Sequence, residues 1–306
     1  MPDIDLELYA EALGEFPITG TPGQKLEAVV QYAIRAPSSD NSQPWRFRIT
    51  KDVLELRADR SRALPVTDPQ DRELIISCGA ALFHVALVLR HFGTMPRIDR
   101  LPDARNPDLL ARVHVGEARE HTAEDEALFH AIPLRRTFRR RFAERCLPDG
   151  FGSALEVAAR SEGAWLQVFR TPEARRAVAD LVAEGDRLQM SDKPMVVRMF
   201  DGGRRQAARD RRQIVDAPLL ALLGTSGDTP YHWLEAGEAI AHMLLRAQVS
   251  GIVASFFNQP IEIPELRTRL QTLAGRDGSP QMLLRLGFGR APRATPRRPV
   301  AEVVEA

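Results

Sequence analysis

The chain has little cysteine and lysine, and it carries none of the common nucleotide- or metal-binding motifs. Its two cysteines, Cys78 and Cys146, are too few for a disulfide framework or a cysteine-based metal site. No G-x-G-x-x-G, Walker loop, H-E-x-x-H or C-x-x-C pattern occurs, so no Rossmann, P-loop or zinc motif is present. The acidic N-terminal stretch lacks a basic region and an apolar region. No signal peptide is therefore expected, and we predict a cytoplasmic protein.

A dominant charge of one sign is also missing. The 306 residues include 42 basic and 41 acidic side chains, which give a formal net charge of +1. No overall field therefore favours nucleic acid or a membrane surface, and we expect neither as a partner. Only Lys25, Lys51 and Lys193 are lysines. The remaining basic residues are arginines, whose planar guanidinium groups suit bidentate contacts to phosphate.

One long apolar run, "LIISCGAALFHVALVL" at residues 74–89, is too short to cross a bilayer, since a spanning helix needs about 20 residues. A helix that is apolar on every side is otherwise buried. We therefore predict the central helix of a large core or of an interface. His84 in this run and His242 in a similar one are expected to be core histidines rather than ligands or bases.

The buried helix has a counterpart later in the chain, because residues 78–93 align without gaps to residues 236–251. The identical pairs are Gly79/Gly237, Ala81/Ala239, His84/His242, Leu87/Leu245 and Gly93/Gly251. The strand-like segment 109–116 also resembles 282–289, and the strand at Trp45 weakly resembles the one at Trp165. Chance matching between alanine- and leucine-rich helices is the alternative. The ordered recurrence of helix and strand favours an internal duplication.

A duplication predicts an α+β fold with two tandem halves. We place them at residues 21–116 and 127–306, after an N-terminal extension (1–20) and on either side of a polar linker (117–126). Each half is expected to pair a mostly antiparallel sheet with helices. The two buried helices are expected to pack together, as in a symmetric dimer fused into one chain. Residues 186–213 contain a Gly-Gly pair and an apolar patch, which fit either a lid or an ordinary surface helix.

Three segments are candidates for ligand binding. The loop "APSSDNSQPWRF" (residues 36–47) separates a helix-like from a strand-like segment, and its simplest interpretation is a turn. In "LRRTFRRRF" (residues 134–142), Pro133 can open a helix that would place several arginines within one and a half turns. Such a cluster at a helix start suits phosphate, although a solvated basic face or a nucleic-acid patch would look alike. Arg297 and Arg298, between two prolines, form either a solvated arm or a second phosphate clamp.

Together these segments resemble the FMN-dependent nitroreductase superfamily. "APSSDNSQPW" is similar to its PS-x-x-N-x-QPW loop, "RRTFR" to its RRS-x-R phosphate motif, and "LGFGRAPRATPRRPV" to its C-terminal end. The order of the motifs and the buried "ELIISCGAALFH" helix look most like the Acg-type branch, whose members fuse two nitroreductase-like halves. The resemblance covers most of residues 21–304, and it implies a nitroreductase-like fold arranged as a pseudo-dimer within one chain.

The resemblance implies FMN as cofactor and NAD(P)H as electron donor. The residues that it implies for cofactor binding are Pro37, Ser38, Ser39, Asn41, Arg135, Arg136, Thr137, Arg139, Phe257, Asn258, Gln259, Arg297 and Arg298. The arginines would hold the phosphate or the pyrimidine edge, and residues 257–259 would lie near the reactive N5. The first copy has the serine-rich loop but no arginine motif before it, and the second has the arginines but "RSEGAW" in place of the loop. We therefore expect one FMN per chain, with the loop from the first copy and the phosphate grip from the second.

The expected function is electron transfer from NAD(P)H through FMN to a small acceptor such as a nitroaromatic or a quinone. No protein acid or base is required, so no catalytic residue is assigned. The alternative is a flavin-sequestering, storage or redox-sensing protein in which a lid covers the flavin. A third class, a nucleic-acid-binding module that uses the arginines, is disfavoured by the balanced charge and the lack of aromatic stacking residues around them.

Overall fold

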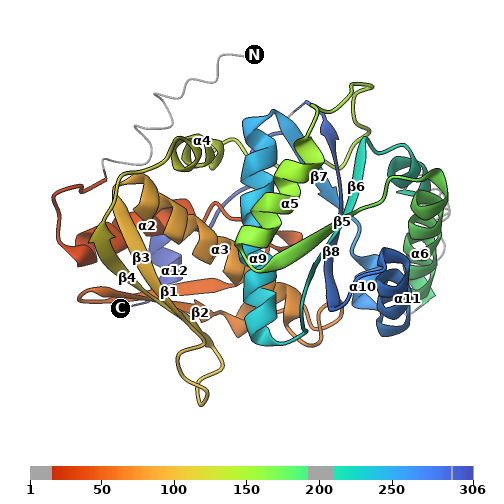
Figure 1. Cartoon of the computed structure of the whole chain (residues 1–306). Helices are drawn as coiled ribbons and strands as arrows, with labels where there is room; N and C mark the ends of the chain where they lie inside the picture. Colours follow the sequence, from red (N-terminus) through yellow and green to blue (C-terminus); the bar gives the residue numbers. More distant parts are fainter. Residues whose placement is uncertain (1–15, 192–209, 291, 306) are drawn as a thin grey trace. The chain divides into compact units, whose positions relative to one another are not determined.

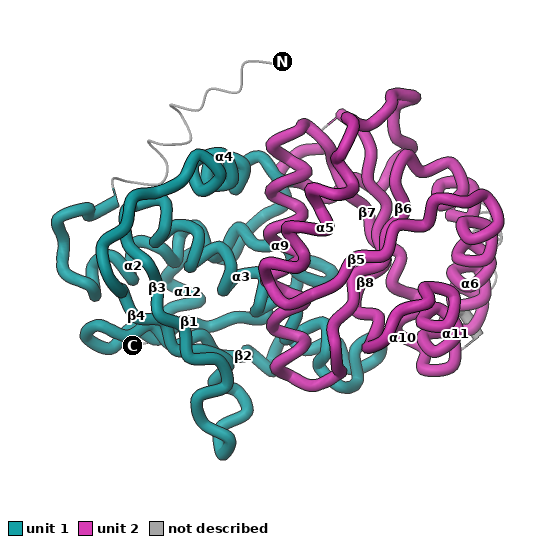
Figure 2. Tube along the Cα trace, viewed as in Figure 1, with its two compact units in different colours: residues 1–135, 295–306 teal, residues 136–294 magenta. Residues whose placement is uncertain are grey.

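The computed structural model describes residues 16–191, 210–290 and 292–305 (Figure 1). Its contacts divide the chain into two compact units, coloured separately in Figure 2. Unit 1 comprises residues 1–135 and 295–306, and unit 2 comprises residues 136–294. The predicted second half began at residue 127 and included the C-terminal segment, whereas unit 1 takes in both ends. The reason is that the C-terminal segment adds a strand to the first sheet.

Unit 1 contains one sheet and three longer helices, together with short 3-10 helices labelled η. Its elements are α2 (Pro22–Ala33), η1 (Ser39–Asn41), β1 (Trp45–Thr50), β2 (Val53–Ala58), η2 (Arg60–Arg62), α3 (Arg72–His91), β3 (Thr94–Arg100), β4 (Leu109–Ala118), α4 (Ala123–Ala131), α12 (Val300–Val303) and β9 (Val304–Glu305). The strand order is β3-β4-β2-β1-β9, and every neighbouring pair is antiparallel except β1 with β9.

Local sequence signals explain how α2 begins. Thr21 and Gln24 form a reciprocal capping box, in which each side chain accepts a hydrogen bond from the other residue's backbone N–H. Pro22 occupies the first turn, where its missing N–H costs no helical hydrogen bond. The buried face of α2, which includes Leu26 and Val30, packs on α3 and on the sheet. This packing places the C-terminal end of α2 beside the loop that precedes β1.

Unit 2 contains a fully antiparallel sheet with helices on both faces. Its elements are α5 (Phe151–Ser161), β5 (Ala164–Val168), α6 (Pro172–Ser191), β6 (Leu219–Thr225), α9 (Pro230–Val249), β7 (Ile252–Phe256), α10 (Gln259–Glu262), α11 (Pro264–Ala274) and β8 (Ser279–Phe288). The strand order is β5-β6-β8-β7. Figure 1 shows α5 and α9 on one face of this sheet and α6, α10 and α11 on the other.

The two sheets share one topology, which agrees with the predicted duplication. In unit 1, the helix pair α2 and α3 brackets β1 and β2, and α3 leads into β3 and β4. In unit 2, α5 and α9 bracket β5 and β6, and α9 leads into β7 and β8. The order β3-β4-β2-β1 therefore corresponds strand for strand to β7-β8-β6-β5. The aligned glycines Gly93 and Gly251 follow α3 and α9, and both have positive φ angles, of 82° and 69°.

The apolar run predicted as a buried helix is α3. By length and composition α3 could cross a membrane, but 89% of its most apolar window is buried inside the protein. Cys78 and His84 are among its buried residues, and α9 is buried along most of its length as well. The predicted burial of both helices is confirmed, whereas their pairing with each other stays a prediction. The mixed α+β class with mainly antiparallel sheets is also confirmed.

Candidate functional site

The serine-rich loop between α2 and β1 holds an unusual backbone conformation. Asp40, Asn41 and Gln43 have positive φ angles of 49°, 56° and 53°. Aspartate and asparagine tolerate this left-handed region better than most residues, whereas a residue such as Gln43 pays about 1–2 kcal/mol for it. Strain of this kind persists only where the surroundings fix the backbone, and it is concentrated at functional sites. The backbone conformation therefore makes the loop a candidate for a functional site.

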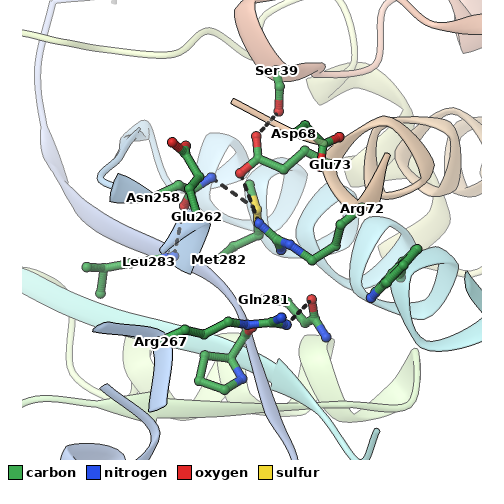
Figure 3. Close-up of polar contacts among 12 residues, drawn as sticks. Ser39, Asp68, Arg72, Glu73, Asn258, Glu262, Arg267, Gln281, Met282 and Leu283 are labelled. Atoms are coloured by element: carbon green, nitrogen blue, oxygen red, sulfur yellow. Dashed lines mark hydrogen bonds and ion pairs between the residues drawn. The ribbon is translucent and has the colours of Figure 1, made fainter. Parts of the chain in front are cut away.

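Polar side chains of α3 hold the middle of this loop. The Ser39 hydroxyl donates to a Glu73 carboxylate oxygen at 2.5 Å, and the Ser39 backbone N–H donates to the Ser77 hydroxyl at 3.3 Å. Figure 3 shows the first contact, with Arg72 close to Glu73; an Arg72 guanidinium nitrogen lies 3.1 Å from the carboxylate. Because Glu73 and Ser77 are one helical turn apart, one face of α3 positions the loop.

The C-terminal segment closes on the other side of the loop. Arg297 donates from Nη1 to Oδ1 of Asn41 at 3.0 Å, and Asn41 donates from Nδ2 to the Pro296 carbonyl at 3.1 Å. The Gln43 side chain accepts the Arg298 backbone N–H at 2.8 Å. The Gln43 backbone N–H donates to the hydroxyl of Ser38 at 3.0 Å. Two segments from opposite ends of the sequence therefore form one local structure within unit 1.

The two C-terminal arginines have different surroundings. The Arg298 guanidinium donates to the carbonyls of Gln43 (3.0 Å) and Glu302 (2.9 Å), and it lies 3.3 Å from the Asp59 carboxylate. Burial alone would raise the pKa of Asp59, but a Ser61 hydrogen bond and the charges of Arg46 and Arg298 outweigh it and lower that pKa. These contacts commit Arg298 to holding the segment. Arg297 also holds this segment, through hydrogen bonds from Nη1 to Asn41 and to the carbonyls of Thr295 and Pro296.

Two backbone carbonyls near the C-terminal end of α2 accept hydrogen bonds from buried side chains, one from Arg135 and one from His84. Arg135 is only 4% exposed, and its Nη2 approaches the Arg35 carbonyl at 3.4 Å. His84 of α3, which is fully buried, makes a 3.1 Å hydrogen bond from Nδ1 to the Tyr32 carbonyl. The expectation that His84 is a core histidine with a local acceptor is confirmed.

The surroundings of His84 lower the pKa of its ring. Burial lowers the pKa of His84 to about 3, helped by the positive charges of Arg135, Arg297 and Arg35. The three arginines come from three separate segments of unit 1. Arg35 was not selected from the sequence, because it belongs to no motif. Its position directly before the serine-rich loop was the available signal.

The predicted helix over the "RRTFR" segment is wrong. Helix α4 ends at Ala131, and the chain then runs in an irregular, extended form in which Thr137 forms a parallel bridge with Ala254. The Phe138 N–H donates to the Ala254 carbonyl at 2.8 Å. Pro133 lies two residues past the last helical residue, where proline stops a helix rather than opening one. Arg136 and Thr137 are half-buried and Arg139 is exposed.

The segment after this motif lines a cavity of about 1130 Å³ within unit 2. Arg141, Phe142 and Arg145 contribute to its wall, together with Arg285 of β8. The buried Arg285 guanidinium lies over the Phe142 ring at 4.2 Å and donates to the Arg140 carbonyl at 2.8 Å. Of the arginine-rich run, Arg141 and Phe142 line this cavity, and the run is not helical.

The predicted flavin-side loop of unit 2, residues 257–259, is tied to its own unit. Phe257 is buried in the core, and its N–H donates to the Leu283 carbonyl at 2.9 Å. The Asn258 side chain accepts the Leu283 N–H at 3.1 Å, and its amide lies 3.4 Å from the Met282 sulfur (Figure 3). Gln259 donates to Asp186 at 3.0 Å. The Phe257 N–H is thus used within the protein.

The predicted lid falls largely on residues that the structure does not describe, whereas Pro37 and Ser38 are described. Most of the lid, residues 192–209 of 186–213, lies outside the described residues, as does most of the N-terminal extension. Pro37 and Ser38 lie at the start of the serine-rich loop and are half-buried. Seven of the predicted positions lie in unit 1, namely Pro37, Ser38, Ser39, Asn41, Arg135, Arg297 and Arg298.

Comparisons with known proteins agree with this picture. No family model matches the chain. It is 31% identical to "Putative NAD(P)H nitroreductase Rv3131" of Mycobacterium tuberculosis over 92% of this chain and 91% of that protein. It is 29% identical to "Putative NAD(P)H nitroreductase acg" of the same organism, over 91% and 94% of the two chains. The chain belongs to the NAD(P)H nitroreductase family. Within that family it falls in the branch that includes Acg.

Solved structures show a more distant likeness. One is the FMN- and NADPH-dependent nitroreductase NfnB from sphigopyxis sp. strain HMH, with 17% identity and a TM-score of 0.46. The match covers 60% of this chain and 99% of that one. At this level the likeness carries no argument about the site.

Proposed function

We propose that this protein is an FMN-dependent oxidoreductase that passes electrons from NAD(P)H to a small acceptor such as a nitroaromatic or a quinone. Membership of the nitroreductase family supports the class of reaction. The observation that carries the proposal is the contact between Arg297 and Asn41 at 3.0 Å. It joins the two family motifs that are furthest apart in the sequence.

The residues of unit 1 fit a phosphate monoester such as the one on FMN. A phosphate needs several charge-assisted donors in a partly desolvated place. Arg135 is almost fully buried, and Arg297 is oriented through Asn41. The strained backbone at Asp40, Asn41 and Gln43 is held on both sides before any ligand binds, so the loop would pay little further ordering cost.

The role of the protein is to bind and orient. Bound FMN supplies the two-electron chemistry, and no acidic or basic side chain is needed for it. Ser39 and Asn41 are held at fixed positions by Glu73, Ser77 and Arg297, so they can line a cofactor without rearrangement. Arg136, Thr137 and Arg139, together with residues 257–259, stay proposals as further cofactor contacts.

The duplication supports one FMN per chain. In unit 2 the residues that join α5 to β5 are only Glu162 and Gly163, where unit 1 has the serine-rich loop. A second copy of this loop is therefore missing from the described part of the chain. We also propose that the protein works in the cytoplasm, with small molecules as partners and without nucleic acid. Its further oligomeric state is left open.

The test begins with the flavin content of the purified protein. We expect a yellow protein with about one FMN per chain, and loss of most of the FMN in Arg135→Ala and Arg297→Ala. Arg160→Ala is the matched control, because Arg160 lies in the last turn of α5 in unit 2 and is exposed. A colourless protein that FMN cannot reconstitute contradicts the proposal.

The second step tests reduction. NADH or NADPH is added without oxygen, and the flavin absorbance is followed. Bleaching that reverses on addition of a nitroaromatic or a quinone is the expected result. Persistence of the oxidised spectrum with both donors contradicts a reductase and would instead indicate sequestration of the flavin.

A further inference from the structure

Three histidines surround one carboxylate where α4 packs on the end of α3. The Glu126 side chain, in the first turn of α4, accepts a hydrogen bond from Nε2 of His130 at 2.8 Å. Nδ1 of His91, the last residue of α3, lies 3.1 Å from Oε2 of this carboxylate, and Nε2 of His121 lies 3.6 Å from the same oxygen. These four side chains, here called the histidine cluster, come from three separate segments of unit 1.

The His91 ring is packed as an aromatic side chain. It stacks on Phe129 of α4, with ring centroids 3.8 Å apart and an interplanar angle of 5°, and it meets Phe92 edge-on at 4.6 Å. Its side chain is 13% exposed, whereas His121 and His130 are exposed. A proton on this ring places a charge in a largely apolar contact, which is unfavourable. The stacking that joins α4 to α3 therefore depends on a neutral His91.

The histidine cluster has one negative charge for three rings that can become positive. The His130 hydrogen bond is the largest cause that lowers the pKa of Glu126, so this carboxylate stays charged while the histidines titrate. The centroid of the His91 ring lies 5.6 Å from that of His121 and 6.1 Å from that of His130. The first proton in the cluster is attracted by Glu126, and each further proton meets a positive ring at this distance. The cluster therefore opposes full protonation.

Asp125, the carboxylate next to Glu126, is committed to two arginines. It forms an ion pair with Arg90 of α3 at 2.9 Å and another with Arg119. Burial alone would raise the pKa of Asp125, but hydrogen bonds from Thr122 and Arg90 outweigh burial and lower that pKa. Asp125 therefore stays charged and paired while the histidines titrate. It holds the first turn of α4 on α3 at both neutral and mildly acid pH.

The direction of the pH response follows from the surroundings of His91. Burial lowers the pKa of His91 most; Glu126 and Asp125 oppose this effect, whereas His130 and His121 add to it. A histidine whose folded-state pKa lies below its unfolded value of about 6.5 stabilises its packed position above that value. This contribution is lost as the pH falls toward the folded value. Acid therefore favours a state in which the His91 ring leaves Phe129 and is solvated.

We propose that the histidine cluster is a pH-sensitive latch, which fastens the C-terminal half of α4 to the end of α3 at neutral pH and releases it below about pH 6.5. Asp125 keeps the first turn of α4 in place. The part that is released comprises Phe129, His130 and the residues that follow them. The latch goes beyond the proposed electron transfer, which requires no pH response.

The end of α4 leads directly into a residue of the candidate site. The backbone N–H of Arg135 donates to the carbonyl of Ala131, the last residue of α4, at 3.0 Å. The Arg135 side chain approaches the Arg35 carbonyl at 3.4 Å. Release of α4 is therefore expected to displace Arg135. This consequence rests on the proposed function, in which Arg135 belongs to the FMN site, and it predicts weaker FMN binding at acid pH.

Amide hydrogen exchange of the full chain tests the latch, because it reports local opening segment by segment. Protection factors are compared at pH 7.5 and pH 5.5, since they correct for the pH dependence of intrinsic exchange. Protection of residues 127–135 is expected to fall at the lower pH, by up to about tenfold per pH unit for each proton taken up. Residues 75–89 of α3 should keep theirs. Unchanged or increased protection of residues 127–135, or an equal loss along α3, overturns the proposal.

Two substitutions in the histidine cluster are expected to change the pH response in opposite directions. His91→Phe keeps an aromatic ring against Phe129 but takes up no proton, so the loss of protection at pH 5.5 should disappear. Glu126→Gln keeps the size of the side chain but removes the counter-charge, so the loss should become larger. The matched control is His114→Asn, because His114 of β4 lies 3.7 Å from a carboxylate outside the cluster. It should keep the wild-type response.

The folding of each variant is checked by circular dichroism and thermal unfolding. If His91→Phe does not fold, His91→Gln replaces it, because its amide is also neutral at both pH values. A loss of protection that persists in a folded His91 variant overturns the latch, since a purely structural contact would leave the pH response unchanged.

The consequence for Arg135 has its own readout. The dissociation constant of FMN is measured at both pH values for wild type and for His91→Phe, because the phosphate itself changes charge near pH 6. A greater loss of affinity at pH 5.5 in wild type supports the displacement of Arg135, and an equal loss contradicts it. A wild-type protein that binds no FMN at pH 7.5 contradicts the proposed function, whereas the latch is decided by the exchange result.

Discussion

Arg297 donates a hydrogen bond from Nη1 to Oδ1 of Asn41 at 3.0 Å, across a sequence separation of 256 residues. The bond joins the C-terminal segment to the serine-rich loop within unit 1. The same loop residue donates back to the Pro296 carbonyl at 3.1 Å. The two segments therefore constrain each other, and a change in either is expected to disturb both.

Replacement of Asn41 separates its backbone role from its side-chain role. Asn41→Ala loses two hydrogen bonds and forces alanine into a left-handed conformation, with φ of 56°. Asn41→Gly loses the same bonds but accepts that conformation. We expect both variants to bind FMN more weakly, and Asn41→Ala to be less stable than Asn41→Gly by about 1 kcal/mol. Denaturant unfolding and FMN titration check this, and equal stability of the two variants contradicts it.

The buried His84 predicts a pH dependence of stability. Burial and three nearby arginines lower its folded-state pKa to about 3 from 6.5. The unfolded chain therefore takes up the proton first as the pH falls. Stability is lost progressively from about pH 6.5 down to about pH 3, by at most about 1.4 kcal/mol per pH unit for this group. His84→Asn should flatten the curve of unfolding free energy between pH 6.5 and 4. Parallel curves for the two proteins argue against a neutral buried histidine.

Asp228 predicts a loss of stability over a lower pH range than His84 does. Burial alone would raise its pKa, but hydrogen bonds from Arg267 and Trp233 outweigh burial and lower the pKa to about 2. A carboxylate with a depressed pKa stabilises the fold above its unfolded value, and the contribution is lost as the pH falls through the folded value. Asp228→Asn should therefore differ from wild type at pH 7 and approach it between pH 4 and 2. Asp216→Asn, at an exposed position, is the control. A difference that stays constant down to pH 2 refutes the prediction.

Replacing either of the aligned glycines after α3 and α9 with alanine is expected to lower stability by a similar amount. Gly93 and Gly251 have positive φ angles, and an added Cβ would meet only the Arg119 carbonyl at 3.5 Å at the first and no atom within 4 Å at the second. Alanine should therefore destabilise each unit through its backbone alone, by about 1–2 kcal/mol. Gly152→Ala, within α5, should instead stabilise by up to about 1 kcal/mol. Unfolding curves of the three variants measure this, and opposite signs for Gly93→Ala and Gly251→Ala would be inconsistent with a shared repeat.

The parts of the fold that depend on local pattern could be predicted from the sequence. The apolar run 74–89 lies within α3, and the recurrence of helix and strand corresponds to two sheets with matching strand order. The helix at 134–142 could not be excluded in the same way. Its backbone pairs with Ala254, a partner that no nearby residue reveals. Such non-local pairing overrides local helix signals.

In the candidate site, too, residues that belong to motifs could be predicted from the sequence, whereas contacts between distant segments could not. The loop residues Ser39 and Asn41 and the arginines Arg135 and Arg297 could be selected because they belong to motifs. The contact of Arg135 with the Arg35 carbonyl could not be predicted, because Arg35 belongs to no motif. The contact of His84 with a carbonyl could be expected, whereas its position among three arginines depends on how separate segments meet.

The discontinuity of unit 1 has a consequence for synthesis. Residues 295–305 are translated only after the whole of unit 2, yet they supply β9 and Arg297 to the first sheet and its loop. A nascent chain that ends anywhere before residue 297 has the serine-rich loop without the arginine that is hydrogen-bonded to Asn41. The loop structure can therefore be completed only after everything between the two parts of unit 1 has been synthesised.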